Sequence, residues 1–253
     1  MDWIAYEHPL DEKTRVYLRI EALLLQIEAG VDGVDAVRYP LFFGGLFNLL
    51  DLLERTDVRA DLIKDLERRE GRLQAYINHP AVDQATLHAI HGELQRVLQA
   101  LCEGHKFGYA LRENRFLATV RQRMGVMGGQ CHNELPELKL WLQQSTQARS
   151  EQAQLWFEQL SVLQHALRVE LKMLREQAEF QSLVAENGSW QSNDEKLSLL
   201  RIRVPAELPV FPLISGHRQR FSIRFMHSQG MQGSQERISY NEQVPFQLAR
   251  CQG

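Results

Sequence analysis

The chain has 253 residues, of which 44% are hydrophobic, so it is long enough to bury a full core as one large domain or two small ones. Its net charge of −3 argues against a protein whose main task is to hold the nucleic-acid backbone. It contains no run of about 18 uncharged apolar residues and no secretory signal pattern, which predicts a cytosolic protein that does not span a membrane.

The cysteines and the distribution of charge narrow the class of protein further. Cys102, Cys131 and Cys251 lie far apart without C-x-x-C spacing, which is typical of packing residues and not of disulfides or zinc ligands. Between Lys196 and Gly253, eight Lys and Arg stand against three Glu, a net charge of +5, whereas residues 1–195 carry 21 against 29, a net charge of −8. Charge gathered in one region indicates a docking surface.

Apolar residues recur at spacings of three and four along most of the chain before residue 185, which predicts a series of amphipathic helices. The first is expected to begin after an N-cap at Asp11 and to run to about Ala29. The later helices are expected over Phe42–Leu53, opened by Tyr39-Pro40; Asp57–Ile77; a segment from the cap Asp83 to near Gly104; Phe107–Met124; and Ser150 to about Phe180.

The last of these helices carries a leucine seam at Leu160, Leu163, Leu167, Leu171 and Leu174. Such a seam can pack within a helical bundle or against a second copy of the chain. Packing within the chain is favoured by roughly two to one, because bundle helices commonly carry this spacing.

Beyond Ala185 the composition changes to Gly, Ser, Asn, Pro and short β-prone runs, which predicts strands and polar loops. Strands are expected at Leu197–Val204, Arg218–Met226 and Val244–Cys251, with further candidates at Trp3–Glu7 and Leu138–Leu142. Polar loops are expected around Ser189–Asn193 and Ser228–Glu236.

These elements predict an α+β fold, in which a mostly helical bundle domain accompanies a smaller, discontinuous antiparallel β domain. We expect the helical domain to comprise residues 11–127 and 146–184. The β domain is expected to comprise residues 1–10, 128–145 and 185–253.

No motif of a known catalytic or metal site occurs in the sequence. There is no H-E-x-x-H, no G-x-S-x-G, no phosphate-binding loop and no G-x-G-x-x-G after a strand. His88 and His91 lie three apart on one predicted helix, but acidic ligands on the same face are lacking, so an ordinary surface pair is favoured over a metal site. We therefore expect a protein that is not an enzyme, without metal or cofactor.

Arginine is the residue type that points to a binding function. Arg15 and Arg19 lie one turn apart on the first predicted helix. On the helix predicted over Phe107–Met124, one polar face collects Arg112, Arg115, Thr119, Gln122 and Arg123, with Arg121 at its margin.

The strand predicted over Arg218–Met226 separates basic from apolar side chains. Arg218, Arg220 and Arg224 share one side of an extended chain, and the other side carries Phe221, Ile223 and Phe225. A solvated sheet face is the ordinary interpretation of a single arginine. Three arginines without an acid between them favour an anionic partner, because neighbouring like charges repel.

Several blocks of the sequence carry a family resemblance. They are EHPLDEKTRVYLRIE at Glu7–Glu21, LRENRFLATVRQRM at Leu111–Met124 with the glycines that follow, LPELKLWL at Leu135–Leu142, and ISGHRQRFSIRFM at Ile214–Met226. In this order and at these separations, the blocks resemble the ZapD family of bacterial cell-division proteins, which are associated with the Z-ring.

The resemblance implies a symmetric dimer, formed through the helical domain, that binds the C-terminal tail of the tubulin-like division protein FtsZ. Two tail sites per dimer would cross-link FtsZ filaments into bundles, so the protein would be cytoplasmic and recruited to midcell. The basic binding surface of the family carries over onto Arg19, Arg112, Arg115, Lys139, Arg218, Arg220 and Arg224.

We expect the FtsZ tail, an extended peptide with carboxylates, to lie in a groove between the arginine helix and the basic strand face. Arginine meets a carboxylate with a two-pronged hydrogen bond, which orients the peptide as well as attracting it. The alternative is a nucleic-acid-binding module that uses the same arginines. The negative net charge and the lack of aromatic residues beside the basic face disfavour it.

Overall fold

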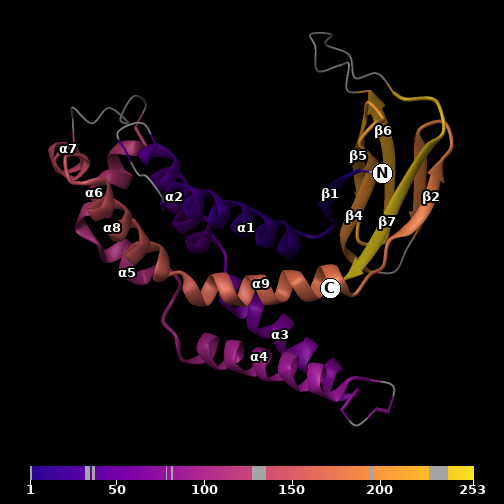
Figure 1. Cartoon of the computed structure of the whole chain (residues 1–253), viewed down its shortest axis with the longest axis horizontal. Helices are drawn as coiled ribbons and strands as arrows, with labels where there is room; N and C mark the ends of the chain where they lie inside the picture. Colours follow the sequence, from indigo (N-terminus) through magenta and orange to yellow (C-terminus); the bar gives the residue numbers. More distant parts are fainter. Residues whose placement is uncertain are drawn as a thin grey trace. The chain divides into compact units, whose positions relative to one another are not determined.

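The computed structural model describes residues 2–31, 35, 38–77, 79–80, 82–126, 135–193, 196–227 and 239–253. They form two compact units, and Figure 1 labels their helices and strands. The β unit comprises Met1–Leu18 and Leu171–Gly253, and the helical unit comprises Arg19–Glu170. Helices and two antiparallel sheets confirm the predicted α+β class.

Several helices of the described ranges begin at a residue whose side chain caps them. Asp11 accepts a hydrogen bond from the Thr14 backbone N–H at 2.7 Å, and Asp57 and Asp83 cap two later helices in the same way. The helices are α1 (Glu12–Val31), α2 (Tyr39–Arg55), α3 (Val58–Gln74), α4 (Gln84–Glu103), α5 (Tyr109–Glu113), α6 (Arg115–Met124), α7 (Pro136–Leu142), α8 (Thr146–Glu158) and α9 (Ser161–Glu176). None of them is long and apolar enough to cross a membrane.

Two predicted helices are each divided in the structure. The helix expected over Phe107–Met124 breaks at Asn114, whose side chain accepts a hydrogen bond from the Leu117 N–H at 3.0 Å and caps α6. Asparagine competes for backbone donors in this way, so it favours a helix start over a helix interior.

The helix expected from Ser150 to Phe180 is α8 and α9, which are separated by a turn at Gln159 and Leu160. The prediction failed because no Gly or Pro marks this turn and the leucine spacing continues through it. The leucine seam is buried, with each of its five side chains at most 2% exposed, which favours packing within the chain.

The strand expected at Leu138–Leu142 is wrong, because this segment lies in helix α7 of the helical unit. Its grouping with the β domain is therefore wrong for residues 135–145, and residues 128–134 lie outside the described ranges. Leu138 and Trp141 are both buried, and a spacing of three belongs to a helix. Trp141 packs on Phe43 and Trp156, with ring centroids 5.5 and 5.9 Å away.

The strands of the β unit pair antiparallel in two sheets, ordered β1-β4-β7-β2 and β3-β6-β5. They are β1 (Trp3–Pro9), β2 (Gln181–Ala185), β3 (Ser189–Asn193), β4 (Leu197–Pro205), β5 (Val210–His217), β6 (Arg220–His227) and β7 (Val244–Gln252). The predicted strands at the N-terminus and at β4, β6 and β7 are confirmed. Glu7 secures β1, because its carboxylate accepts hydrogen bonds from Arg175 at 2.7 and 2.9 Å and from Arg201 at 3.1 Å.

The polar segment Ser189–Asn193 is strand β3 and not a loop, and β5 is a strand that the sequence pattern did not predict. Both lie at the edges of their sheet, where β5 tolerates Pro212. The loop expected at Ser228–Glu236 lies outside the described residues. Among the cysteines, Cys251 is buried as expected, but Cys102 is exposed, so packing is the wrong interpretation for Cys102; Cys131 is not among the described residues.

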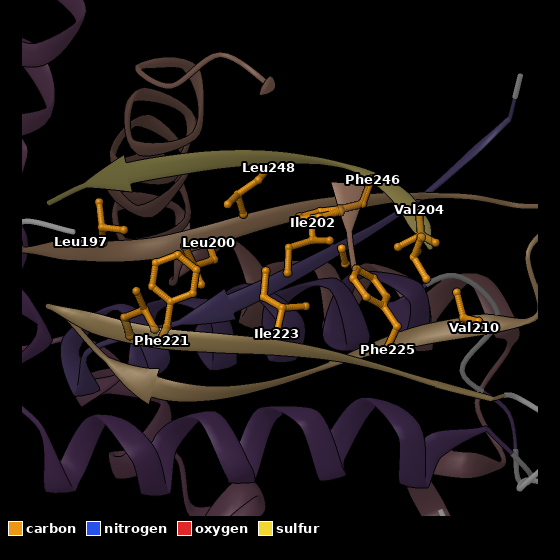
Figure 2. Packing of buried hydrophobic residues seen from close by; sticks show 13 residues of the cluster. Leu197, Leu200, Ile202, Val204, Val210, Phe221, Ile223, Phe225, Phe246 and Leu248 are labelled. Atoms are coloured by element: carbon orange, nitrogen blue, oxygen red, sulfur yellow. The ribbon is translucent and has the colours of Figure 1, made fainter. Parts of the chain in front are cut away.

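The core of the β unit lies between the two sheets. Figure 2 shows Phe221, Ile223 and Phe225 of β6 directed toward the apolar side chains of β4 and β7. These three side chains are at most 1% exposed. Because successive side chains of a strand point to opposite faces, their burial places Arg220, Ser222 and Arg224 on the outer face.

Candidate functional site

The outer face of β6 carries Arg220 and Arg224, both exposed. The expected separation of basic and apolar sides is confirmed for these two arginines. Four residue steps along a strand place their backbone positions about 13–14 Å apart. Each guanidinium therefore marks a separate point of contact on the same face.

The register of the sheet sets the neighbours of these arginines. Arg220 lies opposite Asn193 and His217, and Arg224 lies opposite Ser189 and Leu213. Directly opposed side chains of antiparallel strands share a face. We call this outward surface the arginine face, and it consists of Ser189, Gln191, Asn193, Leu213, Ser215, His217, Arg220, Ser222 and Arg224.

The arginine face carries no carboxylate. In the part of the chain that the structure describes, neither Arg220 nor Arg224 forms an ion pair. Serine hydroxyls and the amides of Gln191 and Asn193 surround them as hydrogen-bonding groups. The face is therefore suited to an anionic partner with several acceptor oxygens.

Arg218 does not belong to this face, although the sequence pattern placed it there. It lies in the turn before β6, and its Nη2 forms an ion pair with Asp11 Oδ2 at 2.9 Å. Burial by itself raises the pKa of Asp11. Hydrogen bonds from the Thr14 N–H and from the Ser198 and Thr14 hydroxyls act in the opposite direction, as does the charge of Arg218. Together they outweigh burial, so the pKa of Asp11 is lowered. Arg218 therefore contributes to the structure at the start of α1.

The remaining predicted residues belong to the helical unit. Arg19, Arg115 and Lys139 are exposed on α1, α6 and α7, whereas Arg112 of α5 is mostly buried and donates from Nη2 to the Phe107 carbonyl at 2.8 Å. Because α5 and α6 are separate helices, the helical period that placed Arg112 on one face with residues of α6 is interrupted at Asn114. The expected groove joins residues of both units and stays a prediction.

Arg121 of α6 is engaged by acidic residues of α2. It donates to both carboxylate oxygens of Glu54, at 3.1 and 3.3 Å, and it also contacts Asp51. The hydrogen bond from Arg121 lowers the pKa of Glu54, and the Glu54 carboxylate in turn raises the pKa of Arg121. This cluster holds α6 against α2.

The histidine pair on α4 is not arranged as a metal site: His88 is exposed, and His91 contacts a neighbouring helix. His91 Nε2 lies 3.3 Å from the Glu70 carboxylate of α3, beside which α4 packs. Within the described ranges, no three His, Cys, Asp or Glu side chains are grouped so that they could hold a metal ion.

The sequence pattern identified Arg220 and Arg224 but missed the residues that complete the arginine face. Gln191 and Asn193 lie in a segment for which a loop was predicted, and Ser215 and His217 lie in β5, for which no strand was predicted. The one local signal for β3 is Trp190, whose ring packs against Phe221 with centroids 5.7 Å apart. A single apolar residue among polar ones is a weak strand pattern.

The comparisons with known proteins cover nearly the whole chain. The sequence model of the ZapD family, described as a cell division protein, matches residues 18–224. Cell division protein ZapD of Vibrio vulnificus (strain CMCP6) is 38% identical over 246 residues, which cover 97% of this chain and 98% of the relative. The proteins of the same name from Vibrio cholerae (strain M66-2) and Aliivibrio fischeri are 37% and 38% identical, over 97% of this chain and 98% and 97% of theirs. The chain thus belongs to the ZapD family of cell division proteins, as the sequence blocks predicted.

Proposed function

We propose that this chain is a non-enzymatic cell-division factor that binds the C-terminal tail of FtsZ through the arginine face. As a dimer formed through its helical part, it cross-links FtsZ filaments in the cytoplasm at the division ring. The observation that carries the proposal is the exposed pair Arg220 and Arg224 on a sheet face without carboxylates. Membership of a cell-division family supports the same role.

The chemistry of the face suits an extended peptide with carboxylates. Each guanidinium of Arg220 and Arg224 offers parallel N–H groups to one carboxylate, and Ser222 between them offers a hydroxyl. Exposed charge pairs of this kind contribute about 1 kcal/mol or less each, so one tail binds weakly.

Bivalence compensates for weak sites. A filament displays many FtsZ tails, so a dimer bound to one tail meets the next at a high effective concentration. In this proposal the helical unit supplies further basic contacts at Arg19, Arg112, Arg115 and Lys139. Arg218 has an indirect role, because its ion pair with Asp11 stabilises the β unit.

Co-sedimentation with GTP-assembled FtsZ tests the proposal. The wild-type protein is expected to pellet with filaments and to bundle them, but not with filaments of FtsZ that lack the C-terminal tail. The variant Arg220→Glu/Arg224→Glu is expected to lose pelleting because two carboxylates on the face repel the tail.

A matched variant separates the site from net charge. Arg72→Glu/Arg96→Glu makes the same change of charge at exposed positions of α3 and α4, and it is expected to pellet like wild type. Pelleting that does not depend on the tail would place the site elsewhere. If wild-type protein does not pellet at all, the proposal is rejected. The next measurement is then the electrophoretic mobility shift of labelled nucleic acid, which tests the alternative function.

A further inference from the structure

A pocket of the helical unit lies at the turn where α2 ends and α3 begins. It has a volume of about 380 Å³, within the range of about 300–1,000 Å³ that small-molecule sites commonly occupy. Its lining residues come from Leu53–Arg59 and, in the segment before α5, from Lys106 and Phe107. The pocket is therefore large enough for a small molecule, and none of the roles above uses it.

Three cationic side chains line this pocket without an acidic partner. Arg55 and Lys106 are exposed, and Arg59 is half-buried. In the part of the chain that the structure describes, none of the three forms an ion pair. The Nη2 of Arg59 donates to the Cys102 carbonyl at 3.0 Å, which fixes this guanidinium in place. Cations gathered around one concave surface reinforce each other's field, so they favour an anionic ligand.

The two acidic side chains of the lining are already engaged within the helical unit. Glu54 accepts hydrogen bonds from Arg121 at 3.1 and 3.3 Å. Asp57 accepts a hydrogen bond from the Ala60 N–H at 3.2 Å and caps α3. The first turn of α3, a helix of 17 residues, adds the positive end of a helix dipole. The binding capacity that remains in the pocket is therefore suited to an anion such as a phosphate group.

An apolar floor lies beside the cations. Leu53 and Val58 are 4% and 2% exposed, and Phe107 is half-buried. The backbone of Phe107 is fixed, because its carbonyl accepts a hydrogen bond from Arg112 at 2.8 Å. Nucleobases stack on aromatic rings, whereas a bare phosphate ion gains nothing from an apolar surface. Floor and cations together suit a molecule that carries both a planar ring and phosphate groups.

We propose that this pocket binds a nucleoside phosphate, with its phosphates at Arg55, Arg59 and Lys106 and its base against Phe107. Arginine and lysine hold phosphate oxygens through charge-assisted hydrogen bonds. Because Arg55 and Lys106 are exposed, each of their contacts is expected to change the Kd by about threefold. Such binding uses no residue of the arginine face and does not require FtsZ.

Calorimetric titration at low ionic strength tests the proposal with three probes: ATP, inorganic tripolyphosphate and adenosine. The variant Arg55→Gln/Lys106→Gln removes two of the three charges of the pocket. As a matched control, Arg72→Gln/Arg96→Gln removes the same charge at exposed positions of α3 and α4 that do not line it. Thermal melts would verify the folding of each variant.

We expect wild type to bind ATP at least about tenfold more tightly than tripolyphosphate or adenosine, because only ATP contacts both the cations and the floor. Arg55→Gln/Lys106→Gln is expected to weaken ATP binding about tenfold, and the matched control to leave it unchanged. Equal binding of ATP and tripolyphosphate to wild type overturns the proposal, even if the pocket variant fails to fold. Absence of ATP binding at millimolar concentration overturns it as well.

A last comparison locates the bound nucleotide. If Arg220→Glu/Arg224→Glu loses ATP binding while Arg55→Gln/Lys106→Gln retains it, the nucleotide binds the arginine face, and the proposal for the pocket is overturned.

Discussion

Arg69 of α3 and Glu170 of α9 form a two-pronged ion pair inside the helical unit, with both N–O distances at 2.6 Å. The two side chains are 4% and 3% exposed, so the pair is nearly removed from water. Burial of two charges is costly, and the close double hydrogen bond offsets that cost. The pair therefore favours one arrangement of α3 against α9 more than it adds to net stability.

Removal of one partner is expected to destabilise the protein strongly. Arg69→Met leaves Glu170 charged and buried, which is expected to lower the free energy of unfolding by about 3–5 kcal/mol. Urea titration followed by circular dichroism would measure it. The double variant Arg69→Met/Glu170→Leu is expected to recover most of the loss, and a double variant no more stable than the single one would contradict this account.

Asp11 is expected to make stability depend on pH. The native pKa of Asp11 is lowered, so its carboxylate stabilises the fold above the unfolded pKa of about 3.9, and this contribution is lost as pH falls through the native pKa. Asp11→Ala also removes the cap of α1, so at pH 7 it is expected to cost about 1–2 kcal/mol. Chemical unfolding of both proteins between pH 7 and pH 2.5 would measure the difference. If the difference in unfolding free energy between wild type and Asp11→Ala does not shrink at low pH, the charge of Asp11 does not stabilise the fold.

The cap at Asn114 separates α5 from α6, and its removal tests why the two helices are not one. Asn114→Ala is expected to lower the free energy of unfolding by about 1 kcal/mol, because the Leu117 N–H loses its acceptor. Asn114→Asp retains an acceptor and is the matched control. Higher stability and higher helicity of the alanine variant would instead show that the two helices can join.

Binding of the FtsZ tail is expected to weaken with salt. Arg220 and Arg224 are exposed, and charge interactions in water are screened over about 8–10 Å near physiological ionic strength. Anisotropy titrations of the tail peptide between low and high salt would measure the effect. Affinity that stays constant over this range would remove the charge contribution from the proposed mechanism.

The sequence alone was sufficient where neighbouring residues decide the structure. The predicted caps Asp11 and Asp83 are found because a carboxylate reaches a backbone N–H only two or three residues away. The alternation in β6 placed Phe221 in the core and Arg220 outside for the same reason, since the period of a strand is two. This part of the candidate site could be predicted.

Only the tertiary structure decided which strands lie beside β6 and which charges are already paired. The polar segment of β3 becomes a strand because β6 supplies its hydrogen-bond partners, so Asn193 and His217 join Arg220 on one face. Arg218 lies two residues from Arg220, yet its partner Asp11 is at the other end of the chain. Pairing across such distances depends on the register of the sheets and on burial of the core, which no local period encodes.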